Sequence, residues 1–213
     1  MHAKLGNAAI SVVALTLTSA EVAFPSVAAS FTLQEATISS INEAFNSGVI
    51  NSQKLVQLYL NRIAAYEDDG PKLNSITTIN PDALNIAAAL DIERQVSGPR
   101  SPLHGIPILL KDNIDTFDLP TSNGSVILKN ALPPDDAFIT QKLRDAGAII
   151  LGKAAMGEFA GGSYNTIDGQ TLNPYSFKRN TGGSSSGSGA ALAANFTVLA
   201  IGTDTSKIGR AHV

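Results

Sequence analysis

Two stretches of this sequence hold the residue types that could do chemistry. One is the glycine- and serine-rich segment TGGSSSGSG at residues 181–189, and the other is Lys111, which directly follows the apolar run IPILL. Glycines before a helix let backbone N–H groups converge on negative charge, which suits a phosphate or an oxyanion. A lysine at the end of a buried strand loses hydration, so its pKa falls and it can serve as a general base.

Each stretch also has a plainer interpretation. Gly/Ser-rich segments are typical of flexible linkers, and most lysines at strand ends extend to water. A linker should join separable domains, yet residues 181–189 lead straight into an alanine-rich helix and an apolar strand. A phosphate-binding loop is excluded on detail, because no Gly-Lys-Ser/Thr is present and no apolar strand directly precedes the glycines.

A nucleophile elbow is a further alternative for the same segment. Residues 183–187, GSSSG, satisfy the G-x-S-x-G pattern with Ser185 as the nucleophile, which would make the chain an α/β-hydrolase-type esterase. An elbow needs a strand directly before it and a histidine after it. The preceding YSFKRNT is a poor strand, and only His212 follows. This interpretation therefore stays the weaker one.

The composition excludes several classes of site. There is no cysteine, so disulfides, thiolate nucleophiles and cysteine-based metal sites are ruled out. The three histidines, His2, His104 and His212, lie far apart in sequence, and we expect neither a metal nor a cofactor. The net charge is −3 with scattered basic residues, so we expect no nucleic-acid partner.

Hydrophobic periodicity predicts the elements that position these residues. Helices are expected at 31–50, at 52–70 with Ser52 as N-cap, and at 80–96 with Asn80 as N-cap. Strands are expected at 74–79, 106–110 and 196–202, and residues 133–156 predict a helix, a glycine turn and a strand in parallel α/β order. One face of the second helix is expected to be apolar: Leu55, Val56, Tyr59, Ile63 and Tyr66.

Four motifs occur in a recognisable order: GIPILLKDNIDT, GAIILGKAAMGEF, NPYSFKRNTGGSSSGSGAALAA and IGTDT. Together they resemble the amidase signature family of serine hydrolases over residues 35–206. The resemblance implies an α/β fold with a mixed sheet flanked by helices, here incomplete at the C-terminus. It also implies an amidase that hydrolyses carbon–nitrogen bonds other than peptide bonds in a small-molecule amide substrate, with a Ser–Ser–Lys triad.

The resemblance assigns roles to individual residues. Lys111 corresponds to the catalytic lysine, and Ser184 corresponds to the bridging serine, which in the family follows a cis peptide bond. Neutral Lys111 would then take a proton, through Ser184, from the attacking serine. The loop residues carried over are Gly182, Gly183 and Asp204 as support, with Thr205 and Ser206 in the oxyanion-hole loop.

The sequence departs from the family directly after GTDT. In the family, two small residues and then the nucleophilic serine follow, but here Lys207 stands at the second small position and Ile208 at the nucleophile. Ser206 lies two residues too early to replace it. We therefore expect a chain truncated before the nucleophile and inactive as written, with residues 207–213 a foreign tail of artefactual origin. The alternative is a non-catalytic, amidase-like binding or regulatory fragment.

The N-terminus predicts a secreted protein. Residues 1–29 combine Lys4, a mostly apolar run from Ala8 to Ala20 and small residues before a cleavage point after Ala29, which indicates a signal peptide. The run is too short for a stable membrane anchor. Residues 30–206 then form the N-terminal part of an amidase domain. Of two glycosylation sequons, at Asn123 and Asn195, we expect the second to be buried and unused, and the oligomeric state stays open.

Overall fold

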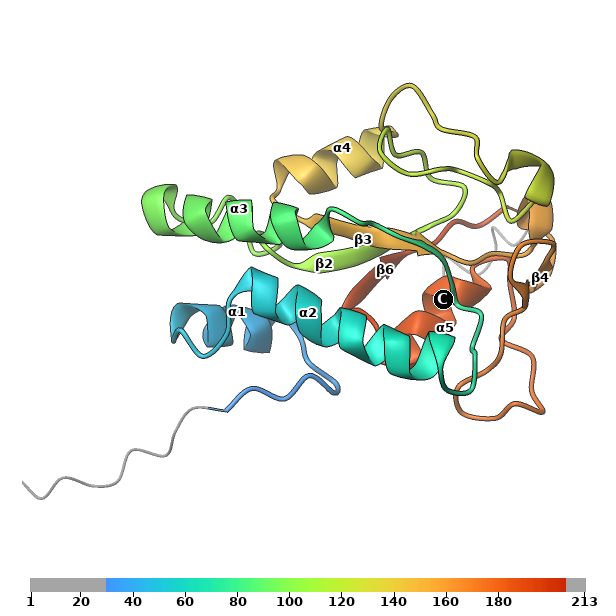
Figure 1. Cartoon of the computed structure of the whole chain (residues 1–213), viewed down its shortest axis with the longest axis horizontal. Helices are drawn as coiled ribbons and strands as arrows, with labels where there is room; N and C mark the ends of the chain where they lie inside the picture. Colours follow the sequence, from blue (N-terminus) through green and yellow to red (C-terminus); the bar gives the residue numbers. More distant parts are fainter. Residues whose placement is uncertain (1–29, 206–213) are drawn as a thin grey trace, which may run out of the picture.

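The computed structural model of the chain describes residues 30–205 (Figure 1). The expected leader at 1–29 and the tail at 207–213 lie outside these residues. The helical elements in chain order are α1 Ile38–Asn46, α2 Ser52–Ile63, the π-helical turn η1 Ala64–Asp68, α3 Ala83–Ser97, the 3₁₀ turn η2 Val126–Leu128, α4 Phe138–Asp145, the 3₁₀ turn η3 Glu158–Ala160, and α5 Ser186–Ala193. The strands are β1 Ile76–Ile79, β2 Pro107–Lys111, β3 Ile149–Ala154, β4 Tyr164–Asn165, β5 Gly169–Gln170 and β6 Leu199–Ile201.

The main sheet is mixed, as predicted. Its order is β1-β3-β2-β6, with β1 antiparallel to β3 and with β2 parallel to both β3 and β6. In Figure 1, α3 and α4 lie above this sheet, and α1, α2 and α5 lie below it. Strands β2 and β3 are fully buried along their length, as expected for parallel strands covered on both faces. The carboxyl end of β2 therefore lies in the middle of the molecule.

The first helix begins seven residues later than predicted, and the N-cap of the second helix lies one residue earlier than predicted. The first helix begins only at Ile38, because Thr37 caps it and accepts a hydrogen bond from the Ser40 backbone N–H at 3.1 Å. Asn51, rather than Ser52, caps the second helix and accepts from the Lys54 N–H at 2.8 Å. An asparagine directly before an apolar helix is as good a cap as serine.

The apolar face of α2 is confirmed except at its last position. Four of the five expected residues are buried: Leu55, Val56, Tyr59 and Ile63. Tyr66 is 43% exposed, because the chain widens after Ile63 into the π-helical turn η1 and the 3.6-residue period is lost. A simple continuation of the helical pattern could not show this change of pitch.

The third helix begins later than predicted. Its N-cap is Asp82, and Asn80 instead joins the helix to the sheet. The Asn80 side-chain amide donates to the carbonyl of Ile150 in β3 at 2.9 Å, and its Oδ1 accepts from the Asp82 N–H at 2.9 Å. Asn80 therefore fixes the β1–α3 connection against β3.

The sequon at Asn195 is built into the fold. Asn195 Oδ1 accepts from the Glu35 N–H at 2.7 Å, and its amide donates to the Glu35 carboxylate at 3.3 Å. Thr197, the third residue of this sequon, is buried and donates to the carbonyl of Pro107. Asn195 is half-buried rather than buried as expected, and the absence of a glycan on it stays a prediction.

Two glycines of α5 give a stability prediction with an internal control. A Cβ on Gly187 would lie 2.4 Å from the carbonyl oxygens of both Ala155 and Ser75, whereas a Cβ on Gly189 meets nothing within 4 Å. We expect Gly187→Ala to lower the free energy of unfolding by about 3 kcal/mol through overpacking. Gly189→Ala should raise it by about 0.5–1 kcal/mol. Urea unfolding of both variants checks this, and equal effects would contradict the close packing of α5 on β3.

Candidate active site

Lys111 is buried at the carboxyl end of β2 and does not extend to water. Its side chain is 0% exposed. The Nζ atom donates to the hydroxyl of Ser184 at 2.6 Å and to the hydroxyl of Thr203 at 2.8 Å. Residues that are 73 and 92 positions away in sequence thus meet at one ammonium group. The parallel neighbours β3 and β6 hold the strand that positions it.

Burial favours the neutral form of Lys111, which is the form that can act as a base. Loss of hydration lowers the pKa of Lys111 below its ordinary value, and the negative charge of Asp204 opposes this change in part. A lowered pKa means that the amine gives up its proton at a lower pH than a solvated lysine does. At a given pH, a larger fraction of the amine is therefore neutral and able to accept a proton.

The backbone before Ser184 is tightly packed at Gly183. The Gly183–Ser184 peptide bond is cis, and Gly182 has a left-handed φ of 76°. A Cβ on Gly183 would lie 1.8 Å from the carbonyl oxygen of Gly162, so only glycine fits. The Gly157 N–H donates to the Ser184 carbonyl at 3.0 Å. The Gly157 contact thus holds the backbone of the residue whose hydroxyl lies within hydrogen-bond distance of Lys111.

Thr203 joins the Gly/Ser loop to the end of β6. Its backbone N–H donates to the Ser185 hydroxyl at 3.2 Å, and its carbonyl accepts from the same hydroxyl at 3.1 Å. Its own hydroxyl accepts from the Asn113 side-chain amide at 3.1 Å, besides Lys111. The sequence-based assignment omitted Thr203, Asn113 and this role of Ser185. The GTDT motif contains Thr203 and could have suggested it, whereas Asn113 and Ser185 became apparent only through their contacts.

The remaining predicted residues lie along the loop that follows. Asp204 is exposed and acts on Lys111 through its charge, and Thr205 is exposed at the end of the described chain. Ser206 and Ile208 lie outside the described residues. Between residues 30 and 205 no group of three or more His, Asp or Glu side chains could hold a metal ion. None of the helices in this range has the length and apolarity for a membrane crossing.

The local structure does not form a nucleophile elbow. Residues 171–183 contain neither helix nor strand, so no strand leads into Ser185. Ser185 is the N-cap of α5, and its hydroxyl is bound to Thr203. The ring of His104 contacts the Leu90 carbonyl and the Arg100 N–H, so it is already engaged in the core. These contacts disfavour the esterase alternative.

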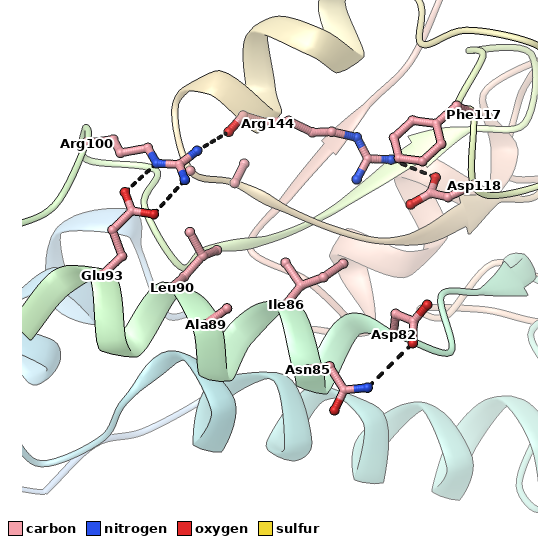
Figure 2. A pocket seen from close by; sticks show the side chains of 12 residues that line it. Asp82, Asn85, Ile86, Ala89, Leu90, Glu93, Arg100, Phe117, Asp118 and Arg144 are labelled. Atoms are coloured by element: carbon pink, nitrogen blue, oxygen red, sulfur yellow. Dashed lines mark hydrogen bonds and ion pairs between the residues drawn. The ribbon is translucent and has the colours of Figure 1, made fainter.

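A pocket of about 610 Å³ lies away from these residues, between α3 and α4 (Figure 2). Two arginines cross its rim. Arg100 pairs with Glu93, and Arg144 pairs with Asp118 at 2.6 Å (Figure 2). Neither Lys111 nor the Gly/Ser loop lines this pocket. Both of its arginines are paired with carboxylates, and the carboxylate of Asp82 also lines it.

Comparison with known proteins identifies the family of the chain. The amidase family model matches residues 54–207. The chain is 39% identical over 182 residues to a putative amidase of Schizosaccharomyces pombe, covering 82% of this chain and 31% of that protein. It is 41% identical over 189 residues to a probable amidase of Arabidopsis thaliana, covering 84% and 36%. A glutamyl-tRNA(Gln) amidotransferase subunit from Acidothermus cellulolyticus is 43% identical over 159 residues, covering 73% and 31%.

The solved structures agree in fold. The peptide amidase from Stenotrophomonas maltophilia superposes with a TM-score of 0.79 at 43% identity, covering 82% of this chain and 37% of that one. The chain thus spans about a third of the length of the relatives that it matches. Over that third, the strand that ends in Lys111, the Gly/Ser loop and the start of the GTDT loop all lie within the matched residues. The chain therefore belongs to the amidase family.

Proposed function

We propose that this chain supplies the lysine and the bridging serine of a Ser–Ser–Lys site that hydrolyses amide bonds of small-molecule substrates. The observation that carries the proposal is the 2.6 Å hydrogen bond between Lys111 Nζ and Ser184 Oγ at a buried strand end. An attacking serine would pass its proton to Ser184 as Ser184 passes its own proton to neutral Lys111. The same relay in reverse would protonate the leaving amine.

The chain as written lacks a serine where the resemblance expects the nucleophile, since position 208 is isoleucine. We propose that the chain by itself does not turn over amides for this reason. Sequencing the transcript across the codon for Ser206 tests this directly. Codons for Gly-Ser-Ile-Arg after Ser206 would place the nucleophile in the natural protein.

We infer the substrate class from the family and from the expected leader. Relatives include enzymes named as amidases, a peptide amidase and subunits named for glutamyl-tRNA(Gln) amidotransferase. The signal peptide expected at residues 1–29 favours a secreted enzyme that acts on free small amides over a subunit that serves tRNA.

A chimera tests the function without depending on the residues after 205. Residues 30–205 replace the matching segment of the Stenotrophomonas maltophilia peptide amidase, which then continues with its own sequence. We expect the chimera to hydrolyse a simple aryl amide, whereas the 213-residue chain alone shows no turnover. A chimera that melts cooperatively yet has no activity would contradict the proposed function, and so would turnover by the chain alone.

A further inference from the structure

Directly behind Lys111 lies a buried carboxylate that the proposed proton relay does not use. Asp112 is 1% exposed and collects three hydrogen bonds from a single loop. Its carboxylate accepts from the Ser122 hydroxyl, from the Ser122 N–H at 3.2 Å and from the Gly124 N–H at 3.1 Å. Its backbone carbonyl accepts from the Asn123 N–H at 3.1 Å. One residue therefore shapes the whole turn at 122–124.

A second buried charge faces Asp112. Lys153 in β3 is 0% exposed and lies beside Leu110 in the strand register, so it points to the face of the sheet opposite Lys111. Its Nζ donates to the Ile114 carbonyl at 2.6 Å and to the Thr121 hydroxyl at 2.8 Å. Lys153 thereby joins the two arms of the 112–121 connection.

The two charges compensate each other. Burial lowers the pKa of Lys153 to about 8, and Asp112 is the carboxylate that most opposes this change. Three further carboxylates also favour its charged form: Asp115, Asp118 and Asp136. Burial raises the pKa of Asp112, while the bonds to Ser122 and Gly124 and the charge of Lys153 lower it. A charge buried without such partners would be costly.

The 122–124 turn packs against residues 156–159, and this segment contacts the backbone of Ser184. Asn123, in a left-handed conformation with φ of 53°, accepts the Phe159 N–H through its carbonyl at 3.0 Å. A Cβ on Gly124 would lie 2.9 Å from the carbonyl oxygen of Met156, so these two backbones are in close contact. The next residue, Gly157, donates to the Ser184 carbonyl.

We propose that Asp112 is a positioning residue of the amidase site, and that it fixes the Ser184 hydroxyl against Lys111 through the 122–124 turn, with Lys153 as its buried counter-charge. This inference rests on the proposed function of Lys111 and Ser184. Misplacement of a catalytic group by about 1 Å can cost about a hundredfold in rate. Loss of the one carboxylate that holds this turn should therefore lower the rate.

The test follows the titration of individual lysines rather than turnover. The 213-residue chain is labelled with ¹³C and ¹⁵N in lysine side chains, and NMR gives the titration midpoints of Lys111 and Lys153. Lys111→Met and Lys153→Met samples assign the signals. Amide spectra and thermal unfolding establish that each variant is folded. An inactive but folded chimera would contradict the proposed function and leaves this measurement intact, because the titration needs no turnover by the 213-residue chain.

Asp112→Asn gives two expected shifts of opposite sign. The Lys153 midpoint falls by about one pH unit, because its main counter-charge is gone. The Lys111 midpoint rises by about 0.5 or more, because the released turn lets Ser184 move and water reach the amine. Loss of a nearby negative charge by itself would lower the Lys111 midpoint, so the sign separates positioning from simple electrostatics. Asp135→Asn, at an exposed site, should leave both midpoints unchanged.

An unchanged or lowered Lys111 midpoint in folded Asp112→Asn would overturn the proposal. If that variant does not fold, Ser122→Ala tests the proposal instead. This variant keeps the charge of Asp112 and removes only one of the hydrogen bonds between Asp112 and the turn. We then expect the Lys111 midpoint to rise while the Lys153 midpoint stays within about 0.3 of its original value. A Ser122→Ala variant with no change at Lys111 would equally overturn the proposal.

Discussion

Replacing Lys111 by methionine in the chimera lowers kcat/KM for an aryl amide by about 10⁴-fold. Methionine has nearly the length of lysine and suits a buried site, so it removes the amine with little loss of packing. The amine is the proton acceptor that the geometry offers, since its Nζ lies 2.6 Å from the Ser184 hydroxyl. The loss should fall on kcat, because the base acts in the chemical step.

The control for this prediction is another lysine changed in the same way. Lys54 is exposed on α2, and Lys54→Met should leave kcat/KM within about twofold. The pH profile adds a second check. Because the pKa of Lys111 is lowered, activity of the unmodified chimera should rise with pH with a midpoint below that of a solvated lysine. Full activity of a folded Lys111→Met chimera would show that Lys111 is not the general base.

Replacing Ser184 by alanine in the chimera is the second large effect, a loss of about 10³–10⁴-fold in kcat. The hydroxyl is the hydrogen-bond partner that would connect the attacking serine to Lys111. Alanine is small and accepts the same backbone, so the Gly157 contact to the carbonyl of residue 184 can persist. Circular dichroism and thermal unfolding of the variant show whether the fold is kept while the rate is measured.

Ser185→Ala is the matched comparison and separates two chemical interpretations. Its hydroxyl binds both backbone groups of Thr203, so its removal should loosen that loop and cost about tenfold in kcat/KM. An esterase with a nucleophile elbow requires the opposite order, with Ser185 essential and Ser184 dispensable. A larger loss in Ser185→Ala than in Ser184→Ala would therefore contradict the Ser–Ser–Lys assignment.

The sequence alone predicted the secondary-structure elements that have strong hydrophobic periodicity or unusual composition. The uninterrupted apolar run before Lys111 predicted a buried strand, and the helix, glycine turn and strand at 133–156 predicted parallel α/β order, which agrees with the parallel pairing of β2 with β3. Such runs have few alternatives, because only a strand covered on both faces can bury every side chain. The errors fell at the ends of helices and strands. At a helix start, neighbouring residues such as Asn51 and Ser52 compete as caps with nearly equal energies.

The family also followed from the sequence, because the lysine and the Gly/Ser segment occur in distinctive local motifs, and the Ser–Ser–Lys type of the site stays a prediction from the same motifs. What only the tertiary structure decided is which groups touch. Lys111 contacts Ser184 and Thr203 because the carboxyl ends of β2 and β6 meet the loop that precedes α5. The burial that lowers its pKa, and the pairing of Asp112 with Lys153 behind it, depend on the packing of residues far apart in sequence. No local pattern encodes such contacts, since hydration and charge are set by everything that surrounds a residue in space.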